Sequence, residues 1–297
     1  MTLSTPVASV VSTVSVASVA SVASPRKAIS ALLANGVLIV IALCFLLPLA
    51  WLVLASLDVK ATYQTQIPAE LSLDNFAAVL TPELTFLPLW NSFLLSGGAA
   101  IVTVVASVLA AYPLSRYAMR FNRPFMYAVL FGTCLPITAI MVPVYSLFVR
   151  LNLLDSMPAT IFFMAATSLP MAIWMTKNFM DSVPISLEEA AWVDGASAMT
   201  ALRRIVVPLM RPGLSVVFIF VFIQSWGNFF VPFVLLLSPS KQPAAVSIYS
   251  FFGQYGAIAY GQLAAFSVLY SVPVILLYVL VSRGIGGSFT LSGAIKG

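Results

Sequence analysis

Few side chains in this sequence have the types and spacing that enzyme chemistry requires. Histidine, the commonest general base and transition-metal ligand, does not occur among the 297 residues. Cys44 and Cys134 both lie within apolar runs, without the spacing of a metal site. We expect them to be small buried hydrophobic residues rather than a disulfide. The sequence therefore predicts no catalytic residue, no metal site and no bound cofactor in this chain.

One polar segment, residues 176–212, has a pattern suited to binding. Ser186 and Glu189 form the S-x-x-E pattern of a helix capping box, and Glu188 adds a second acid to the first turn. Gly195 is a natural helix stop two turns later. A second helix is expected from about Ser197 to Val206, and Pro208 is expected to halt it.

This helix–glycine–helix unit has two interpretations. It could be a capped helix that only joins two membrane spans. It could also be a compact knob that a soluble partner receives in a groove.

The elements around this segment are six long apolar stretches. Only 8% of the residues are charged, which is too few for the surface of a soluble protein of this size. Each stretch holds about 18–27 residues, enough to cross a bilayer as a helix, and proline residues predict bends in several of them. The expected spans are Ala31–Leu57, Asn91–Leu114, Met126–Val149, Pro158–Met175, Gly213–Leu237 and Leu263–Ser282.

The positive charges predict the orientation of these spans. With the N-terminus inside, the inside segments hold 11 of the 14 Lys and Arg residues, so both termini are predicted to be cytoplasmic. The outside segments hold only Lys60, Arg150 and Lys241. The net charge of +5 is thus a topology signal, and no nucleic-acid partner is needed to explain it.

The expected spans also lack charged side chains. No acidic or basic side chain lies inside them, which argues against a proton-driven carrier and against an intramembrane enzyme. The sequence contains no G-x-x-x-x-G-K-[ST] phosphate loop. If transport is powered, the energy must come from another subunit.

The chain is expected to have four parts. Residues 1–27 form a cytoplasmic N-terminal tail rich in Val, Ser and Ala, predicted to be disordered, with a weak interfacial strand as the alternative. Residues 28–90 hold the first span and an extracytoplasmic loop. Residues 91–282 form the core with five spans, and residues 283–297 form a cytoplasmic C-terminal tail.

The segment 176–212 carries a family resemblance. Glu189-Ala190-Ala191, Gly195, Ile205 and Pro208 stand at the spacing E-A-A-x3-G-x9-I-x-L-P, with Val207 in place of the usual Leu. This pattern resembles the EAA loop of binding-protein-dependent ABC importer permeases. The substitution of Val for Leu is a small apolar change.

Other segments extend the resemblance from the first span to the C-terminus. They are similar to the MalG-like carbohydrate permeases of that family, and the last six residues resemble the G-A-V-K-G ending of those subunits. One departure is Trp226-Gly227-Asn228-Phe229, which lacks the acid of the family pattern. The similar segments are Asn91-Ser92, Ala111-Tyr112-Pro113-Leu114-Ser115-Arg116, Val142-Pro143-Val144-Tyr145, Leu153-Leu154-Asp155-Ser156 and Ser292-Gly293-Ala294-Ile295-Lys296-Gly297.

The resemblance implies an all-α integral membrane protein with six transmembrane helices and the type I ABC importer fold, located in the cell (inner) membrane. It implies a non-enzymatic subunit that moves a sugar or oligosaccharide. The implied partners are a second permease, with a heterodimer favoured, two ATPase subunits that bind ATP and Mg, an extracytoplasmic solute-binding protein and membrane lipid.

The resemblance also implies roles for particular residues. Glu189 would contact the ATPase, although it could instead cap its own helix. Ala294, Lys296 and Gly297 would reach the ATPase interface, although a frayed terminus is the alternative. The full set expected to couple to the ATPase is Ser186, Glu188, Glu189, Ala190, Ala191, Asp194, Gly195, Ala196, Ile205 and Pro208.

The path of the solute is less clearly marked. Its candidate residues are polar or aromatic, and each could instead serve helix packing or anchor the chain at the interface. Outer loops 58–90 and 238–262 are expected to face the binding protein. The candidates are Tyr145, Gln224, Ser225, Trp226 and Asn228.

Two other functions remain as alternatives. A permease of the same class could carry glycerol phosphate or another polar solute. A stand-alone channel or facilitator would need no ATPase, and it would have no use for the docking unit of residues 176–212.

Overall fold

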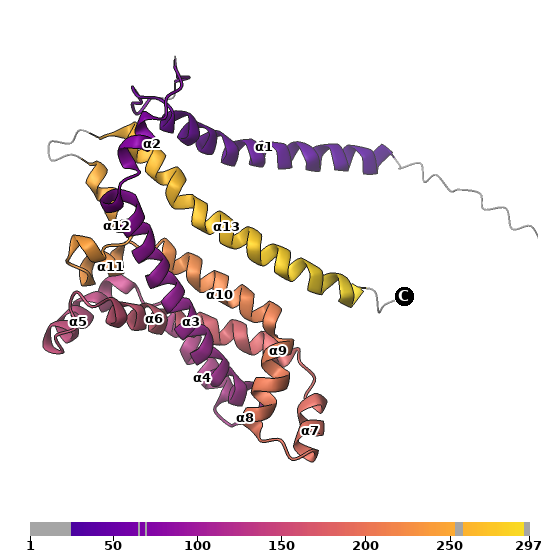
Figure 1. Cartoon of the computed structure of the whole chain (residues 1–297). Coiled ribbons are helices and arrows are strands. Elements are labelled where there is room, and N and C mark those ends of the chain that lie inside the picture. The colour runs from indigo at the N-terminus through magenta and orange to yellow at the C-terminus, as the bar shows by residue number, and fades with distance from the viewer. Residues whose placement is uncertain (1–24, 65, 69, 253–257, 294–297) are drawn as a thin grey trace, which may run out of the picture. The chain divides into compact units, whose positions relative to one another are not determined.

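The computed structural model is helical throughout most of the chain (Figure 1). The described residues are 25–64, 66–68, 70–252 and 258–293. Within them the only β pairing is one antiparallel bridge, Phe252–Ile258. The predicted all-α class is therefore confirmed.

The chain divides into two units at the Ala50–Trp51 boundary, and each is described by itself. The first consists of most of helix α1, Pro25–Ser56, which has Pro48 in its interior. The predicted disorder of the N-terminal tail concerns residues that lie almost wholly outside the described part.

The second unit contains the remaining helices. Short π-helical turns at Pro82–Phe86 and Leu202–Val206, and 3-10 turns at Pro239–Lys241 and Ile248–Phe251, adjoin them. Its helices are α2 (Asp74–Val79), α3 (Leu87–Arg116), α4 (Asn122–Gly132), α5 (Ile137–Arg150), α6 (Met157–Asp181), α7 (Ser186–Val193), α8 (Ala198–Ala201), α9 (Val207–Leu209), α10 (Arg211–Trp226), α11 (Phe230–Leu235), α12 (Ala244–Ser247) and α13 (Tyr260–Gly293).

Four to six spans fit the lengths and composition of the described helices. Four are long and apolar enough to cross a membrane alone, and two bent pairs meet the same criteria together: α4 with α5, at 89°, and α8–α9 with α10, at 79°. The four single helices are Leu33–Ser56, Pro82–Arg116, Met157–Asp181 and Tyr260–Arg283.

Two expected spans are broken rather than continuous. The stretch Met126–Val149 divides at 133–136, because Pro136 takes an extended conformation at the start of α5 and disfavours helix in the residue before it. The stretch Gly213–Leu237 divides between α10 and α11, where Gly227 ends α10. The bend expected within Met126–Val149 is confirmed, because α4 and α5 meet at 89°.

Helices α3, α6 and α10 form the centre of the second unit. Ala100 of α3, Ala172 of α6 and Val217 of α10 belong to one buried cluster, so the three helices meet through small or β-branched side chains. The Ser107 and Thr176 hydroxyls lie 2.9 Å apart across the α3–α6 contact. Such small and hydroxyl side chains let membrane helices approach closely.

A methyl group at Gly213 should destabilise this centre. A Cβ atom there would lie 2.5 Å from Cγ of Phe179 and 2.9 Å from its Cβ, so α6 and α10 must separate. We expect Gly213→Ala to lower the free energy of unfolding by about 1–3 kcal/mol. The measurement is the melting temperature of the purified protein in detergent.

Gly97→Ala is the matched control. A Cβ atom at Gly97 would meet nothing within 4 Å, so this variant should gain helix propensity instead. Equal melting temperatures for the two variants would contradict the close approach of α6 and α10.

Candidate coupling loop and solute groove

Residues 176–212 form the predicted helix–turn–helix. Helix α7 ends at Val193, and Gly195 follows with a φ of +85°, a left-handed conformation that favours glycine. The Ser197 side chain then caps α8 by accepting a hydrogen bond from the Thr200 amide at 3.3 Å. The glycine turn and the second helix start are therefore confirmed.

Two details of this loop differ from expectation. Helix α7 already includes Ser186, and no side chain caps its start, so the Ser186–Glu189 capping box does not form. Pro208 does not stop the second helix either, because it lies in the first turn of α9, where proline needs no amide donor. The sharp bend comes after Leu209, before α10.

The outward side of α7 offers a mixed apolar and acidic surface. Val193 is 89% exposed and Trp192 is 37% exposed. Glu189 and Ala190 are exposed, as are Asp194 and Gly195 after the helix, while Ala191, Ala196 and Ile205 are half-buried. Apolar side chains this exposed at a helix end mark a surface that another protein can cover.

Glu188 is buried, whereas its neighbour Glu189 is exposed. The Glu188 side chain is fully buried, and its Oε1 accepts a hydrogen bond from Nε of Arg116 at 2.6 Å. Its Oε2 accepts a second bond from the Tyr112 hydroxyl at 2.9 Å. Tyr112 and Arg116 belong to a segment whose family resemblance was visible in the sequence, but no sequence signal assigned them a partner 72 to 76 residues away.

The second helix of the loop is held by apolar packing. Leu202 and Val206 are buried against Ala111 of α3 and Met180 of α6. This cluster lies at the Arg116 end of α3, so the loop and the Glu188 contacts share one end of the helix.

A groove with polar side chains in its wall opens between α4, α5, α6 and α10. Its volume is about 770 Å³, and a smaller adjoining hollow shares four residues with it. A cavity of this size is within the range of small-molecule sites. The shared residues are Thr167, Ser168, Gln224 and Asn228, and neither hollow is lined by an acidic or basic side chain.

Only some of the five residues predicted on the solute path line the groove or the adjoining hollow. Gln224 and Asn228 line the groove and Ser225 lines the hollow, whereas Trp226 is 4% exposed and stacks on Phe222 and Tyr270. Tyr145 lines neither space. The sequence reasoning missed Thr133, Thr167 and Ser168, and their only signal is hydroxyl groups within apolar stretches of the sequence.

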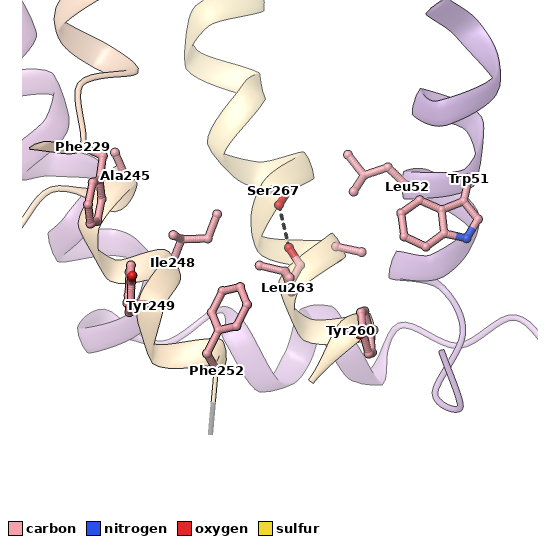
Figure 2. Close-up of a pocket in the computed structure, with 11 residues that line it drawn as sticks. Trp51, Leu52, Phe229, Ala245, Ile248, Tyr249, Phe252, Tyr260, Leu263 and Ser267 are labelled. Carbon is pink, nitrogen blue, oxygen red and sulfur yellow. Dashed lines mark hydrogen bonds between the residues drawn. The ribbon is translucent and has the colours of Figure 1, made fainter. Parts of the chain in front are cut away.

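A second pocket, of about 610 Å³, has almost wholly apolar walls (Figure 2). Phe229, Tyr249 and Phe252 lie along one side of it, and Leu263 and Ser267 of α13 lie along another. The Ser267 hydroxyl donates to the Leu263 carbonyl of its own helix. The groove offers more hydrogen-bonding groups and is therefore the better candidate for a polar solute.

Polar contacts at the Leu87 end of α3 fasten the segment 235–244. Asn91 donates to the carbonyl groups of Ser240 and Gln242, at 2.9 and 3.1 Å, and the Ser92 hydroxyl accepts from the Ala244 amide. Asp155 accepts from Nζ of Lys241 at 2.7 Å and from the Ser238 hydroxyl at 2.6 Å. Asn91 and Arg116 are 25 helix positions apart, about 37 Å along α3.

The stability that these contacts give to the folded protein should depend on pH through the carboxyl group of Asp155. The hydrogen bonds from Lys241 and Ser238 hold the pKa of Asp155 well below its ordinary value of 3.8. A lowered pKa stabilises the folded state above the ordinary value, and that stabilisation is lost as the pH falls towards the folded pKa. We expect Asp155→Asn to melt below the native protein at pH 6 and the difference to shrink by pH 3.

The control for this series is Asp74→Asn, because Asp74 is exposed at the start of α2. Melting curves in detergent at several pH values give the comparison. A difference between Asp155→Asn and the native protein that stays constant with pH would contradict the assignment.

The remaining predictions concern metals, thiols and the C-terminus. No group of three metal-ligating side chains occurs in the described part of the chain. Cys44 and Cys134 are free but exposed, so their predicted burial was wrong: apolar runs in a membrane protein also face lipid. The predicted ATPase contacts Ala294, Lys296 and Gly297 lie outside the described residues.

Comparisons with known proteins agree on one family. A family model described as "Binding-protein-dependent transport system inner membrane component" matches residues 103–287. The sulfoquinovosyl glycerol transport system permease protein SmoH of Agrobacterium fabrum is 30% identical over 274 residues, 91% of this chain and 92% of that relative. The trehalose transport system permease protein SugB of Mycobacterium tuberculosis is 30% identical over 256 residues, 85% of this chain and 93% of that relative.

A solved structure resembles the fold. A chain of a bacterial ABC transporter involved in the import of the acidic polysaccharide alginate superposes with a TM-score of 0.75. The two are 23% identical, and the match covers 88% of this chain and 98% of that one.

Proposed function

Because the chain belongs to the family of binding-protein-dependent transport system inner membrane components, we propose that it forms the path for a neutral sugar or oligosaccharide in an ATP-driven importer. The chain is a multi-pass permease subunit and not an enzyme. In the proposed complex a binding protein delivers the solute from outside, a second permease completes the path, and two ATPase subunits supply the energy.

The polar groove is the observation that carries the choice of solute. Its shared lining offers two hydroxyl and two amide side chains and no charge. Gln224 lines both the groove and the adjoining hollow, so its amide stands where a solute would bind. A neutral polyhydroxy compound needs such uncharged donors and acceptors, whereas a phosphate ester would need a cation, which this lining lacks.

The proposed orientation follows from the two ends of α3. Loop 176–212 lies at the Arg116 end, where basic residues gather, so we place this end in the cytoplasm. The segment 235–244 is fastened at the opposite end and would face the binding protein. The exposed surface of α7 would then meet the ATPase, and Glu189, Ala190 and Gly195 would belong to that contact.

Uptake of labelled solutes tests the proposal. The complete transporter would be reconstituted in vesicles and offered neutral oligosaccharides, anionic oligosaccharides and glycerol phosphate, with and without ATP and binding protein. We expect ATP-dependent uptake of a neutral sugar that requires the binding protein. Uptake of glycerol phosphate alone would replace the proposed solute, and ATP-independent uptake would favour a facilitator.

Replacing Gln224 by Leu should weaken this uptake. The variant keeps the size of the side chain but removes an amide from the groove. We expect uptake at low sugar concentration to fall about tenfold, the factor for a lost hydrogen bond of about 1.4 kcal/mol. The control is Ser215→Ala on the same helix, because the Ser215 hydroxyl bonds only to Arg211 of its own helix.

A further inference from the structure

Helix α7 is attached to the membrane helices through a single buried side chain. Of its eight residues only Glu188 is buried. Leu187 and Val193 are 44% and 89% exposed, and no residue of α7 belongs to a buried apolar cluster in the described part of the chain. Helix α7 also lies beside α8 and the turn Leu202–Val206, but Glu188 is its one buried side chain in the described residues.

The contacts of Glu188 are directional at both carboxylate oxygens. Nε of Arg116 binds one oxygen at 2.6 Å and the Tyr112 hydroxyl binds the other at 2.9 Å, from positions one turn apart on α3. Arg116 is itself 3% exposed. Charge-assisted bonds of this geometry resist sliding and rotation, whereas apolar contacts are non-directional.

The same arginine also holds the segment that leads into α7. Its Nη2 donates to the Val183 carbonyl at 3.1 Å, two residues after the end of α6. Its Nη1 contacts the Ser115 hydroxyl, which donates to Asp181 at the end of α6. The ends of α3 and α6 and the middle of α7 thus meet around one guanidinium group.

The charges of this cluster balance. Arg116 faces Glu188, and Lys177 pairs with Asp181 at 2.6 Å. Buried ion pairs add little net stability, but their geometry can define how two elements are placed. A balanced, buried and directional contact is therefore suited to keep α7 in a constant position on α3.

We propose that Glu188, Arg116 and Tyr112 are positioning residues that link α7 to α3 and transmit the movement of α7 to the membrane helices. This inference rests on the proposed docking of an ATPase on α7. The exposed Glu189 faces the partner, and the buried Glu188 faces the permease itself. Two adjacent glutamates thus serve the two sides of the same helix.

The first test measures sugar import and ATP hydrolysis by the complete transporter, reconstituted in vesicles, with Glu188→Gln in this chain. This change keeps the shape of the side chain and removes its charge. We expect the ATPase to remain bound and to hydrolyse ATP, while the sugar imported per ATP falls by about 2-fold to 30-fold, the range for a coupling loss of 0.5–2 kcal/mol. The control is Arg120→Gln, which removes one charge from an exposed side chain beyond the end of α3.

Charge reversal separates a link from a merely structural contact. The double variant Arg116→Glu with Glu188→Arg restores an opposite pair, so it should import more sugar per ATP than either single variant. No rescue, together with a normal ratio in Glu188→Gln, would overturn the proposal.

A distance measurement tests the link without any sugar. Spin labels would be placed at the exposed residues Leu187 and Met119, after replacement of Cys44 and Cys134 by Ala. We expect one narrow distance distribution in the otherwise native transporter, with and without ATP, and a broad one with Glu188→Gln. Narrow distributions in both would overturn the link, even if the sugar proves to be another solute.

Discussion

Arg116→Met should be among the most destabilising single changes in this protein. It leaves the Glu188 carboxylate fully buried without its cation, and removing one partner of a buried ion pair costs about 3–5 kcal/mol. The Tyr112 hydroxyl alone cannot balance a full negative charge in this position. We expect a strongly lowered melting temperature in detergent and a reduced amount of protein in the membrane.

Two further variants show that the unpaired charge is the cause. Arg116→Met combined with Glu188→Met removes both charges and should recover most of the stability, because an apolar pair can replace a buried ion pair. Arg120→Met removes an exposed arginine one turn after α3 and should change little. If the double variant is as unstable as Arg116→Met alone, lost packing rather than lost pairing explains the effect.

The membrane helices could be predicted because lipid leaves few options. A backbone in a bilayer must satisfy its hydrogen bonds within its own segment, so each long apolar run had to be helical. The places of the breaks could not be predicted from proline alone. Pro113 and Pro170 lie inside unbroken helices, whereas Pro136 stands at the break between α4 and α5.

The coupling loop was predictable to the extent that its backbone depends on local chemistry. Gly195 permits the left-handed turn and Ser197 caps the next helix, and both residues are recognisable signals in the sequence. Which of the two glutamates is buried depends on tertiary packing. Adjacent helix residues point about 100° apart, and only the position of Arg116 decides that Glu188 is the buried one.

The groove was only partly predictable for a related reason. Gln224 and Asn228 are amides four residues apart within an apolar region, which is an unusual pattern that sequence analysis can find. Thr167 and Ser168 are common in membrane helices, where their hydroxyls bond to the preceding turn, as both do here with the Met164 carbonyl. Only the packing of α6 near the end of α10 brings them to the same cavity.

Val193→Asp should abolish import by detaching the ATPase. Val193 is 89% exposed at the end of α7, next to Trp192, and an exposed apolar tip of this kind is typical of a side chain that a partner buries. A charge at such an anchor is expected to weaken binding at least about 30-fold, the effect of about 2 kcal/mol. Copurification of the ATPase with the permease, followed by sugar uptake, measures both consequences.

The stability of this variant distinguishes lost docking from misfolding. Val193 belongs to no buried cluster in the described residues, so the permease itself should melt as the native protein does. Met119→Asp introduces the same charge at an exposed residue outside the loop and should retain the ATPase. Retention of the ATPase by Val193→Asp would exclude α7 as the docking surface. Its loss, set beside an ATPase that stays bound but uncoupled in Glu188→Gln, would show that the two faces of α7 have separate tasks.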